Sequence, residues 1–215
     1  MRGNTAAPAR SGRDSARTQS YCGRAAAQVS GRFERSGDMS VTGKSEVATK
    51  SKNSISVLFV CMGNICRSPT AEGVLRQLIA TEAADLEVTI DSAGTHGYHI
   101  GASPDPRSQA AARRRGIDLG GLRARRLVAA DFERFDYVLV MDGQNYADAN
   151  EIAPVHYRAI FRRFMDYAPE TGRSEIPDPY YGDASGFDQV LDLTEAASRG
   201  LLKSLRARGA RSDGR

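Results

Sequence analysis

The 215 residues include only three cysteines and three histidines, and no tryptophan, so little material exists for disulfides or metal sites. An odd number of cysteines does not make a disulfide framework. His96, His99 and His156 show no metal-ligand spacing. No histidine or third cysteine lies near Cys61 and Cys66 to complete a tetrahedral ligand set. We therefore expect no metal site.

Long hydrophobic runs are missing too. No stretch approaches the roughly 20 apolar residues that span a bilayer. The N-terminal segment also lacks the apolar core, about 7–15 residues long, of a secretory signal. The sequence therefore predicts no membrane insertion and no secretion.

The positive charge of the chain lies at its ends. Residues 1–52 hold ten Lys or Arg and four Asp or Glu, and residues 201–215 hold five and one, whereas residues 53–200 hold 15 and 21. A nucleic-acid binder carries its basic residues as a patch on the folded unit. We therefore expect no nucleic-acid partner and interpret the charged ends as solvated segments.

The first 52 residues are rich in Arg, Ser, Ala and Gly and poor in large apolar residues, which predicts a disordered basic extension. Two alternatives stay open. An Arg-rich, Ser-rich and acid-poor composition is also typical of an organellar transit peptide, and Met39 offers a later start of translation. We expect the folded domain to comprise residues 53–208, followed by a disordered basic tail at 209–215.

From residue 54 onward, strand-like and helix-like segments alternate. The run ISVLFV (55–60) is apolar and rich in β-branched residues, which is typical of a strand buried on both faces. Such alternation predicts a parallel α/β sheet with right-handed crossovers. Ligands of these sheets bind at the carboxyl ends of the strands, where Cys61 lies. Further strands are expected at 86–90, 136–140 and within 157–164, and helices from Ser68, over about 106–115, from about 143 and across 187–205.

The loop 61–68 joins the first strand to a helix, where unpaired N–H groups and the helix dipole favour an anion. Gly63 and Asn64 permit the tight backbone turns of an anion-binding nest. Arg67 supplies a planar fork of donors for two oxygens of a tetrahedral oxyanion. Ser68 is suited to cap the helix, with Pro69 at its first position.

Cys61 lies at the base of this positively polarised loop, which favours the thiolate over the thiol. The Ser68 hydroxyl is placed to donate to that thiolate. A lone buried cysteine is usually an inert filler, but C-x5-R followed by Ser-Pro at a strand–helix junction is a joint pattern. A nucleophile beneath a phosphate ringed by donors indicates in-line phosphoryl transfer through a cysteinyl-phosphate.

The segment from Cys61 to Ser68 resembles the signature C-x-G-N-x-C-R-S of the low molecular weight protein tyrosine phosphatases. The resemblance implies an α/β fold with a four-stranded parallel sheet of order 2-1-3-4 and helices on both faces. It also implies an enzyme, a protein-tyrosine phosphatase that hydrolyses phosphotyrosine through a cysteinyl-phosphate. Further family blocks follow in order across about residues 55–207: DSAGT (91–95), PDPR (104–107), RAR (123–125), DFERFDYVLVMD (131–142) and DPYYG (178–182).

The same resemblance assigns catalytic roles. Cys61 would be the nucleophile, Arg67 would bind the phosphate, and Asp178 would be the general acid that protonates the leaving phenolate and then activates water. Without the phosphatase loop, Asp178 between two prolines would be an ordinary turn residue. The phosphate-binding loop would comprise Met62, Gly63, Asn64, Ile65, Cys66, Arg67 and Ser68.

Other residues would shape and protect the site. Ser92 would brace Asn64. Cys66 would capture oxidised Cys61 as a reversible disulfide, although a well-packed loop residue explains it equally well. The substrate ring would contact Ile65, Tyr98, Tyr180 and Tyr181.

One region departs from the family pattern. Some relatives carry a histidine before the Ala-Arg segment that partners the acid of Met-Asp, whereas Leu122 and Arg123 stand there in this chain. We therefore expect Asp142 to cap a helix rather than to form a His–Asp pair. We also expect the chemistry not to depend on Asp142.

Three alternatives are weighed against a tyrosine phosphatase. A thioredoxin-coupled arsenate reductase needs further downstream cysteines, and none follows Cys66. Phosphoarginine phosphatases resemble this chain but carry threonine in place of Ile65 and a single aromatic after Asp-Pro. A non-catalytic phosphate-binding scaffold would have lost the cysteine, the arginine or the acid, and all three are present.

The resemblance also implies partners. Substrates would be phosphotyrosine proteins, among them autophosphorylating tyrosine kinases in a bacterial host. No cofactor is expected, because arginine and backbone amides supply the positive charge. The reactive thiol indicates a reducing compartment and therefore the cytoplasm. We expect a monomer or weak dimer.

Overall fold

Within residues 54–212, the part of the chain that the computed structural model describes, four parallel strands form one sheet. The predicted order 2-1-3-4 and the parallel pairing are confirmed. The extension predicted at 1–52 lies outside the described residues. The strands are β1 (Ile55–Cys61), β2 (Val88–Gly94), β3 (Tyr137–Val140) and β4 (Ile160–Arg163).

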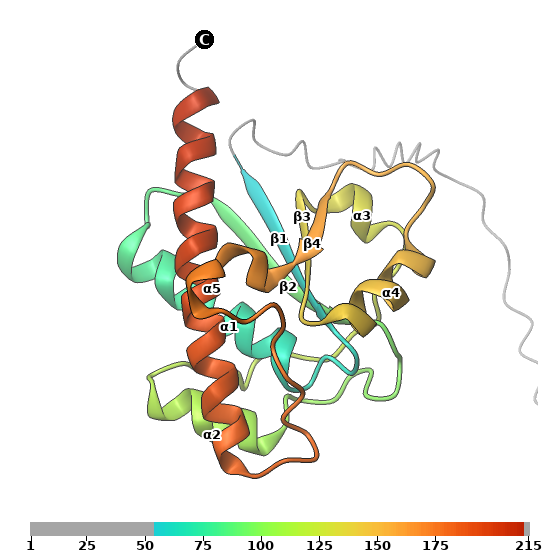
Figure 1. Cartoon of the computed structure of the whole chain (residues 1–215), viewed down its shortest axis with the longest axis vertical. Coiled ribbons are helices and arrows are strands. Elements are labelled where there is room, and N and C mark those ends of the chain that lie inside the picture. The colour runs from blue at the N-terminus through green and yellow to red at the C-terminus, as the bar shows by residue number, and fades with distance from the viewer. Residues whose placement is uncertain (1–53, 213–215) are drawn as a thin grey trace, which may run out of the picture. The chain divides into compact units, whose positions relative to one another are not determined.

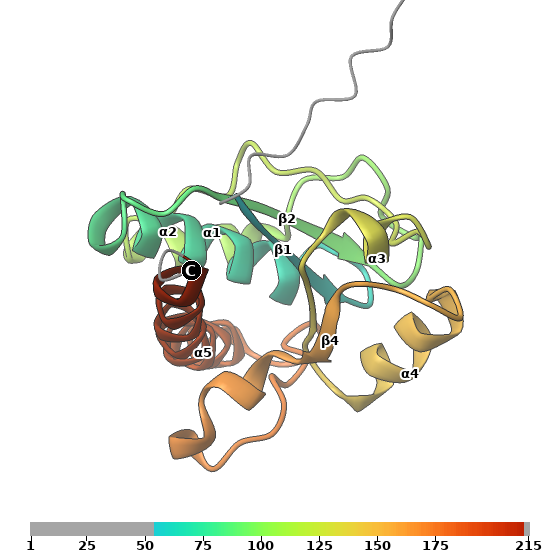
Figure 2. The ribbon, with the colours of Figure 1, turned by 90° about the horizontal axis from the view of Figure 1, so that it is seen from above.

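Helices cover both faces of this sheet, as predicted (Figures 1 and 2). Alternate side chains of β1 point to opposite faces. Val57 and Phe59 belong to the core beneath α1 and α5, and Leu58 and Val60 belong to the core beneath α3 and α4. Both faces of the sheet are therefore shielded from solvent at β1, which explains why this strand is apolar at consecutive positions. The helices are α1 (Arg67–Glu82), α2 (Pro106–Arg114), α3 (Asp131–Arg134), α4 (Gly143–Ile152) and α5 (Ala184–Ser212).

The second strand extends further than the sequence predicts. β2 was expected at 86–90, but it pairs with β1 in register as far as Gly94, opposite Cys61. Asp91 and Ser92 have turn-forming character, yet the ladder with β1 carries them into the strand. This extension brings Ser92 to the edge of the sheet at which the loop 61–66 begins.

Two predictions about helix ends are wrong. α1 begins at Arg67, and Cys66 occupies the capping position without a side-chain hydrogen bond, so Ser68 is not the cap. The backbone of α5 is helical through Ser212, so residues 209–212 continue the helix instead of forming a tail.

Two short 3-10 helices, η1 (Phe164–Tyr167) and η2 (Pro169–Thr171), follow β4. No helix of the described part of the chain is long and apolar enough to cross a membrane.

Candidate active site

The loop between β1 and α1 is held by its carbonyl groups. The carbonyls of Cys61 and Met62 accept from the N–H groups of Thr95 and His96, at 2.9 and 3.0 Å. Among the hydrogen bonds of residues 54–212, none takes up the N–H groups of residues 62–66. A short loop with several unpaired amides at a helix start is suited to bind an anion.

Asn64 fixes the shape of this loop from inside. Its φ of 55° is in the left-handed region, the conformation that the sequence predicted to be tolerated there. The buried side chain donates from Nδ2 to the hydroxyls of Ser68 and Ser92, both at 2.9 Å, and accepts at Oδ1 from the N–H of Arg125 at 2.9 Å. The contact expected between Ser92 and Asn64 is therefore present.

Cys61 ends β1 with its side chain buried, 3% exposed. Its Sγ lies 3.1 Å from Oγ of Ser68, in the contact that the sequence predicted. Because Ser68 already accepts from Asn64, its own hydrogen is available for the sulfur. Cys61 and Cys66 are both free thiols.

Arg67 is almost completely buried, 1% exposed, and is held by carboxylates from two distant segments. Its Nη1 pairs with Asp142 and also donates to the carbonyl of Ile176 at 3.2 Å, while Nη2 lies 2.7 Å from Oδ2 of Asp178. Burial opposes the charged form, but the negative groups of Cys61, Asp178 and Asp142 outweigh it and raise the pKa of Arg67. The guanidinium therefore remains charged inside the protein.

Asp142 caps α4, as predicted, by accepting from the N–H of Asn145 at 2.6 Å. Its other oxygen pairs with Arg67, a contact that the sequence did not predict. Whether the chemistry depends on Asp142 is therefore a question for mutation of this residue. One carboxylate thus links the start of α4 to the loop arginine. These two contacts account for the position of Asp142 without a histidine partner.

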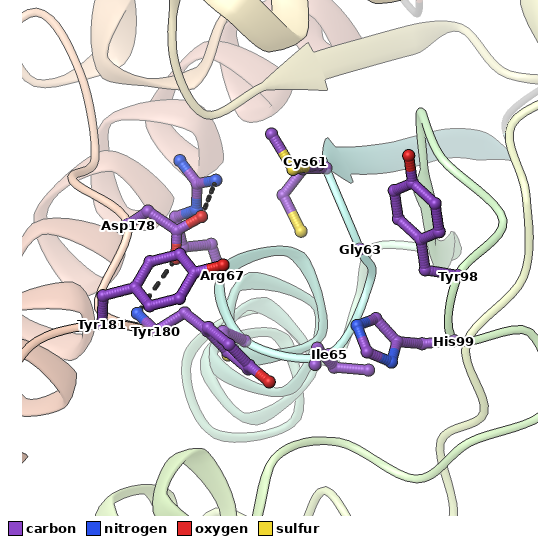
Figure 3. Close-up of a pocket in the computed structure, with 11 residues that line it drawn as sticks. Cys61, Gly63, Ile65, Arg67, Tyr98, His99, Asp178, Tyr180 and Tyr181 are labelled. Atoms are coloured by element: carbon purple, nitrogen blue, oxygen red, sulfur yellow. Dashed lines mark hydrogen bonds and ion pairs between the residues drawn. The ribbon is translucent and has the colours of Figure 1, made fainter.

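The residues predicted to bind substrate converge on one cavity of about 240 Å³ (Figure 3). Cys61 and Arg67 lie at its base, Tyr98 and His99 line one side, and the segment from Asp178 to Tyr181 lines the other. The lining comprises Cys61, Met62, Gly63, Ile65, Cys66, Arg67, Tyr98, His99, Asp178, Tyr180 and Tyr181. Asn64, Ser68 and Ser92 are buried behind this lining.

The aromatic rim is open to solvent. The side chains of Tyr98 and Tyr181 are 78% and 96% exposed, so they stand at the mouth of the cavity rather than in a core. Tyr98 stacks on His96, with ring centroids 5.4 Å apart, and Tyr180 packs edge-on against Tyr181 at 5.0 Å. A buried thiol below an exposed aromatic rim suits a phosphate carried on a flat substituent.

The model of the family described as "Low molecular weight phosphotyrosine protein phosphatase" matches residues 56–211. The chain belongs to this family. A putative low molecular weight protein-tyrosine-phosphatase of Synechocystis is 43% identical over 150 residues, which cover 69% of this chain and 95% of the relative.

Solved structures of the family have the same fold. The crystal structure of YfkJ from Bacillus subtilis is 38% identical, with a TM-score of 0.67, and covers 72% of this chain and 96% of that protein. The crystal structure of DARP, named as a Drosophila arginine phosphatase, is 28% identical, with a TM-score of 0.65, and covers 69% and 96%. The fold of this phosphatase family is therefore shown by two independent comparisons.

One lining residue of this phosphatase-family site was missed from the sequence. From the sequence, His99 was considered only as a metal ligand, but this loop residue lines the cavity, and a Cβ added at Gly63 would lie only 3.0 Å from its Cδ2. The imidazole thus packs against the loop, and Gly63 is needed for that approach. The sequence signal that could have identified His99 is its position directly after Tyr98, which was predicted to line the site.

Among the described residues, no group of three His, Cys, Asp or Glu side chains is placed to hold a metal ion.

Cys66 borders the same cavity. It is 5% exposed, and burial raises the pKa of its thiol to about 12, although the Ser108 hydroxyl favours the thiolate. The thiol form therefore dominates at neutral pH. A protective role for Cys66 stays a prediction.

Proposed function

We propose that this chain is a protein-tyrosine phosphatase in which Cys61 is the nucleophile, Arg67 and the loop amides bind the phosphate, and Asp178 is the general acid. The observation that carries the proposal is the convergence of three groups on one cavity. A buried thiol and a charged arginine form its base, and a carboxylate stands on its wall, 2.7 Å from that arginine.

The reaction then follows in two balanced steps. The Cys61 thiolate attacks phosphorus as the bond to the phenolic oxygen breaks, and the Asp178 carboxyl gives its proton to that oxygen. Water next attacks the cysteinyl-phosphate and gives a proton to the Asp178 carboxylate, which releases inorganic phosphate and restores the thiolate. Ser68 donates to the sulfur when the thiolate leaves, and Arg67 and the amides of 62–66 stabilise the equatorial oxygens.

The cavity supports an aryl phosphate as substrate. Cys61 is 3% exposed, whereas Tyr181 at the rim is 96% exposed, so a phosphate bound at the thiol lies below a rim of exposed aromatic rings. A phosphotyrosine ring would extend from that phosphate toward the rim, with Ile65, Tyr98, Tyr180 and Tyr181 in contact with its faces and edges. A serine or threonine phosphate is shorter and would leave the aromatic rim uncontacted.

Phosphoarginine is the second candidate, because one structural relative is named an arginine phosphatase. A phosphorylated guanidinium is also long and flat. Ile65 and the paired Tyr180 and Tyr181 favour an aromatic ring, because they enlarge the apolar wall. We therefore rank phosphotyrosine first.

The biological setting is also part of the proposal. The nucleophile works only as a reduced thiol, which supports a cytoplasmic location. Phosphotyrosine proteins, including an autophosphorylating tyrosine kinase, are the proposed partners, and the working species is a monomer or weak dimer.

The test is turnover of p-nitrophenyl phosphate in EDTA and reductant by the wild type, Cys61→Ser and Asp178→Asn. We expect no turnover from the first variant and strongly reduced turnover from the second. Peptides carrying phosphotyrosine or phosphoarginine then decide the substrate. A folded wild type without turnover would favour the phosphate-binding scaffold instead.

A further inference from the structure

Glu72, on the first turns of α1, is a buried carboxylate that does not line the cavity. The residue is only 3% exposed to solvent. Oε2 accepts from the Ser92 hydroxyl at 2.7 Å, and Oε1 accepts from Nε and Nη2 of Arg76 at 3.1 and 2.8 Å. Burying a charge is costly unless it is paired and hydrogen-bonded, so one oxygen is used for the ion pair and the other for Ser92.

The Ser92 contact continues to the reactive sulfur. A carboxylate can only accept, so the Ser92 hydroxyl must donate to Glu72 and accept from Asn64. The Asn64 amide donates a second hydrogen to Ser68. The Ser68 hydrogen then faces Cys61 Sγ at 3.1 Å, with the carbonyl of Ala93 as a more distant acceptor at 3.4 Å.

Asn64 is fixed from two ends. The N–H of Arg125 holds Oδ1, and Ser92 holds Nδ2. Without Glu72, the Ser92 hydroxyl, 4% exposed, would be buried without its acceptor and would turn away from its present direction. Asn64, whose backbone is left-handed, would then lose one of the three hydrogen bonds of its side chain.

We propose that Glu72 is a positioning residue, which acts through Ser92 and Asn64 to direct the Ser68 hydrogen toward the Cys61 thiolate. The proposal rests on the proposed function in that Cys61 is the nucleophile. Each contact in the series lies between 2.7 and 3.1 Å. A carboxylate on α1, outside the loop 61–66, thus orients the Ser68 hydroxyl beside Cys61.

The experiment measures the pH midpoint of Cys61 alkylation by iodoacetate, with mass spectrometry to locate the modified cysteine. Glu72→Met removes the acceptor at similar length, and Glu72→Gln keeps one acceptor oxygen. We expect Glu72→Met to raise the midpoint by about one pH unit, the effect of one lost hydrogen bond to a charged group. Glu72→Gln should lie between this variant and the wild type. kcat/KM for p-nitrophenyl phosphate should fall about tenfold in Glu72→Met.

Ser92→Ala tests the route. It should raise the midpoint as Glu72→Met does, and the double variant should equal Ser92→Ala, because Glu72 acts through that hydroxyl. Leu78→Ala is the matched control on the same helix, since its buried side chain belongs to an apolar cluster that does not include Cys61. It should lower thermal stability without moving the midpoint.

Two results would overturn the proposal. One is an unchanged midpoint in folded Glu72→Met and Glu72→Gln, and the other is a double variant whose shift equals the sum of the two single shifts. Alkylation does not need turnover. Shifted midpoints in a protein that hydrolyses no substrate would therefore support the positioning role while contradicting the proposed function.

Discussion

Arg67 holds two carboxylates at once, Asp142 through Nη1 and Asp178 through Nη2, the latter at 2.7 Å. The two pairs differ in surroundings, because the side chain of Asp142 is 20% exposed and that of Asp178 is 41% exposed. The inner pair orients the guanidinium, whereas the outer pair can be exchanged. A phosphate that accepts from Nη2 would replace Asp178 as the partner of this nitrogen and leave the Asp178 carboxyl free to face the leaving oxygen.

Asp178→Asn should therefore impair hydrolysis according to the leaving group. General acid catalysis contributes about 100-fold to 10,000-fold, so we expect at least a hundredfold fall in kcat for a phosphotyrosine peptide. p-Nitrophenolate leaves with little need of a proton, so the fall for p-nitrophenyl phosphate should be smaller. Steady-state kinetics with both substrates measure this ratio.

Inhibition by inorganic phosphate is the control for this variant. Asparagine removes the carboxylate that shares Arg67, so phosphate should bind at least as tightly as in the wild type. An equal loss of kcat with both leaving groups would show that Asp178 is not the acid.

Asp142→Asn should separate the two contacts of Asp142. The asparagine oxygen can still cap α4 at the N–H of Asn145, but its amide donates toward Arg67 instead of accepting. We expect kcat/KM to fall about tenfold or more while the free energy of unfolding changes by less than about 1 kcal/mol. Kinetics and urea unfolding of the same preparation measure the two effects.

Asp142→Ala is the comparison, because it removes the cap as well. It should lower the free energy of unfolding by a further amount of about 0.5–2 kcal/mol. If Asp142→Asn retained full activity, the contact with Arg67 would have no role in orienting the guanidinium.

The fold and the phosphate loop could be predicted because their signals are local. The apolar run of β1 and the residues from Cys61 to Ser68 are contiguous, and the periodicity of α1 begins directly after them. The sequence blocks of the family, matched in order along the chain, were enough to predict that Cys61, Arg67 and the tyrosine segments lie at one cavity. Local chemistry and order along the chain were enough for these features.

Contacts between distant segments could not be predicted in the same way. Asp142 and Asp178 lie 75 and 111 residues from Arg67, and no local pattern pairs them with it. Glu72 has Arg76 four residues later, which on a sequence is typical of an exposed ion pair. Only the packing of β2 against α1 shows that this carboxylate is buried and reaches Ser92.

Gly200→Ala should destabilise the protein without touching the cavity. A Cβ at Gly200 would lie 1.8 Å from the carbonyl oxygen of Tyr167, so α5 must move away from η1. Overpacking of this kind costs about 1–3 kcal/mol or more. Gly121→Ala is the matched control, because a Cβ there meets nothing within 4 Å. Urea unfolding should show a clear loss for the first variant only, and equal curves would contradict the close packing of α5 on Tyr167.

Cys66 should make stability fall at alkaline pH. Burial raises the pKa of its thiol to about 12, whereas the pKa of a cysteine thiol in the unfolded chain is about 8.5–9. Between about pH 9 and 12 the folded state therefore binds the extra proton, and the free energy of unfolding falls as pH rises, by up to about 1.4 kcal/mol per pH unit. Cys66→Ala lacks this group, so the difference between wild type and variant in urea unfolding should shrink steadily from pH 9 to 11. A difference that stays constant across this range would mean that Cys66 ionises as easily in the folded protein as in the unfolded chain.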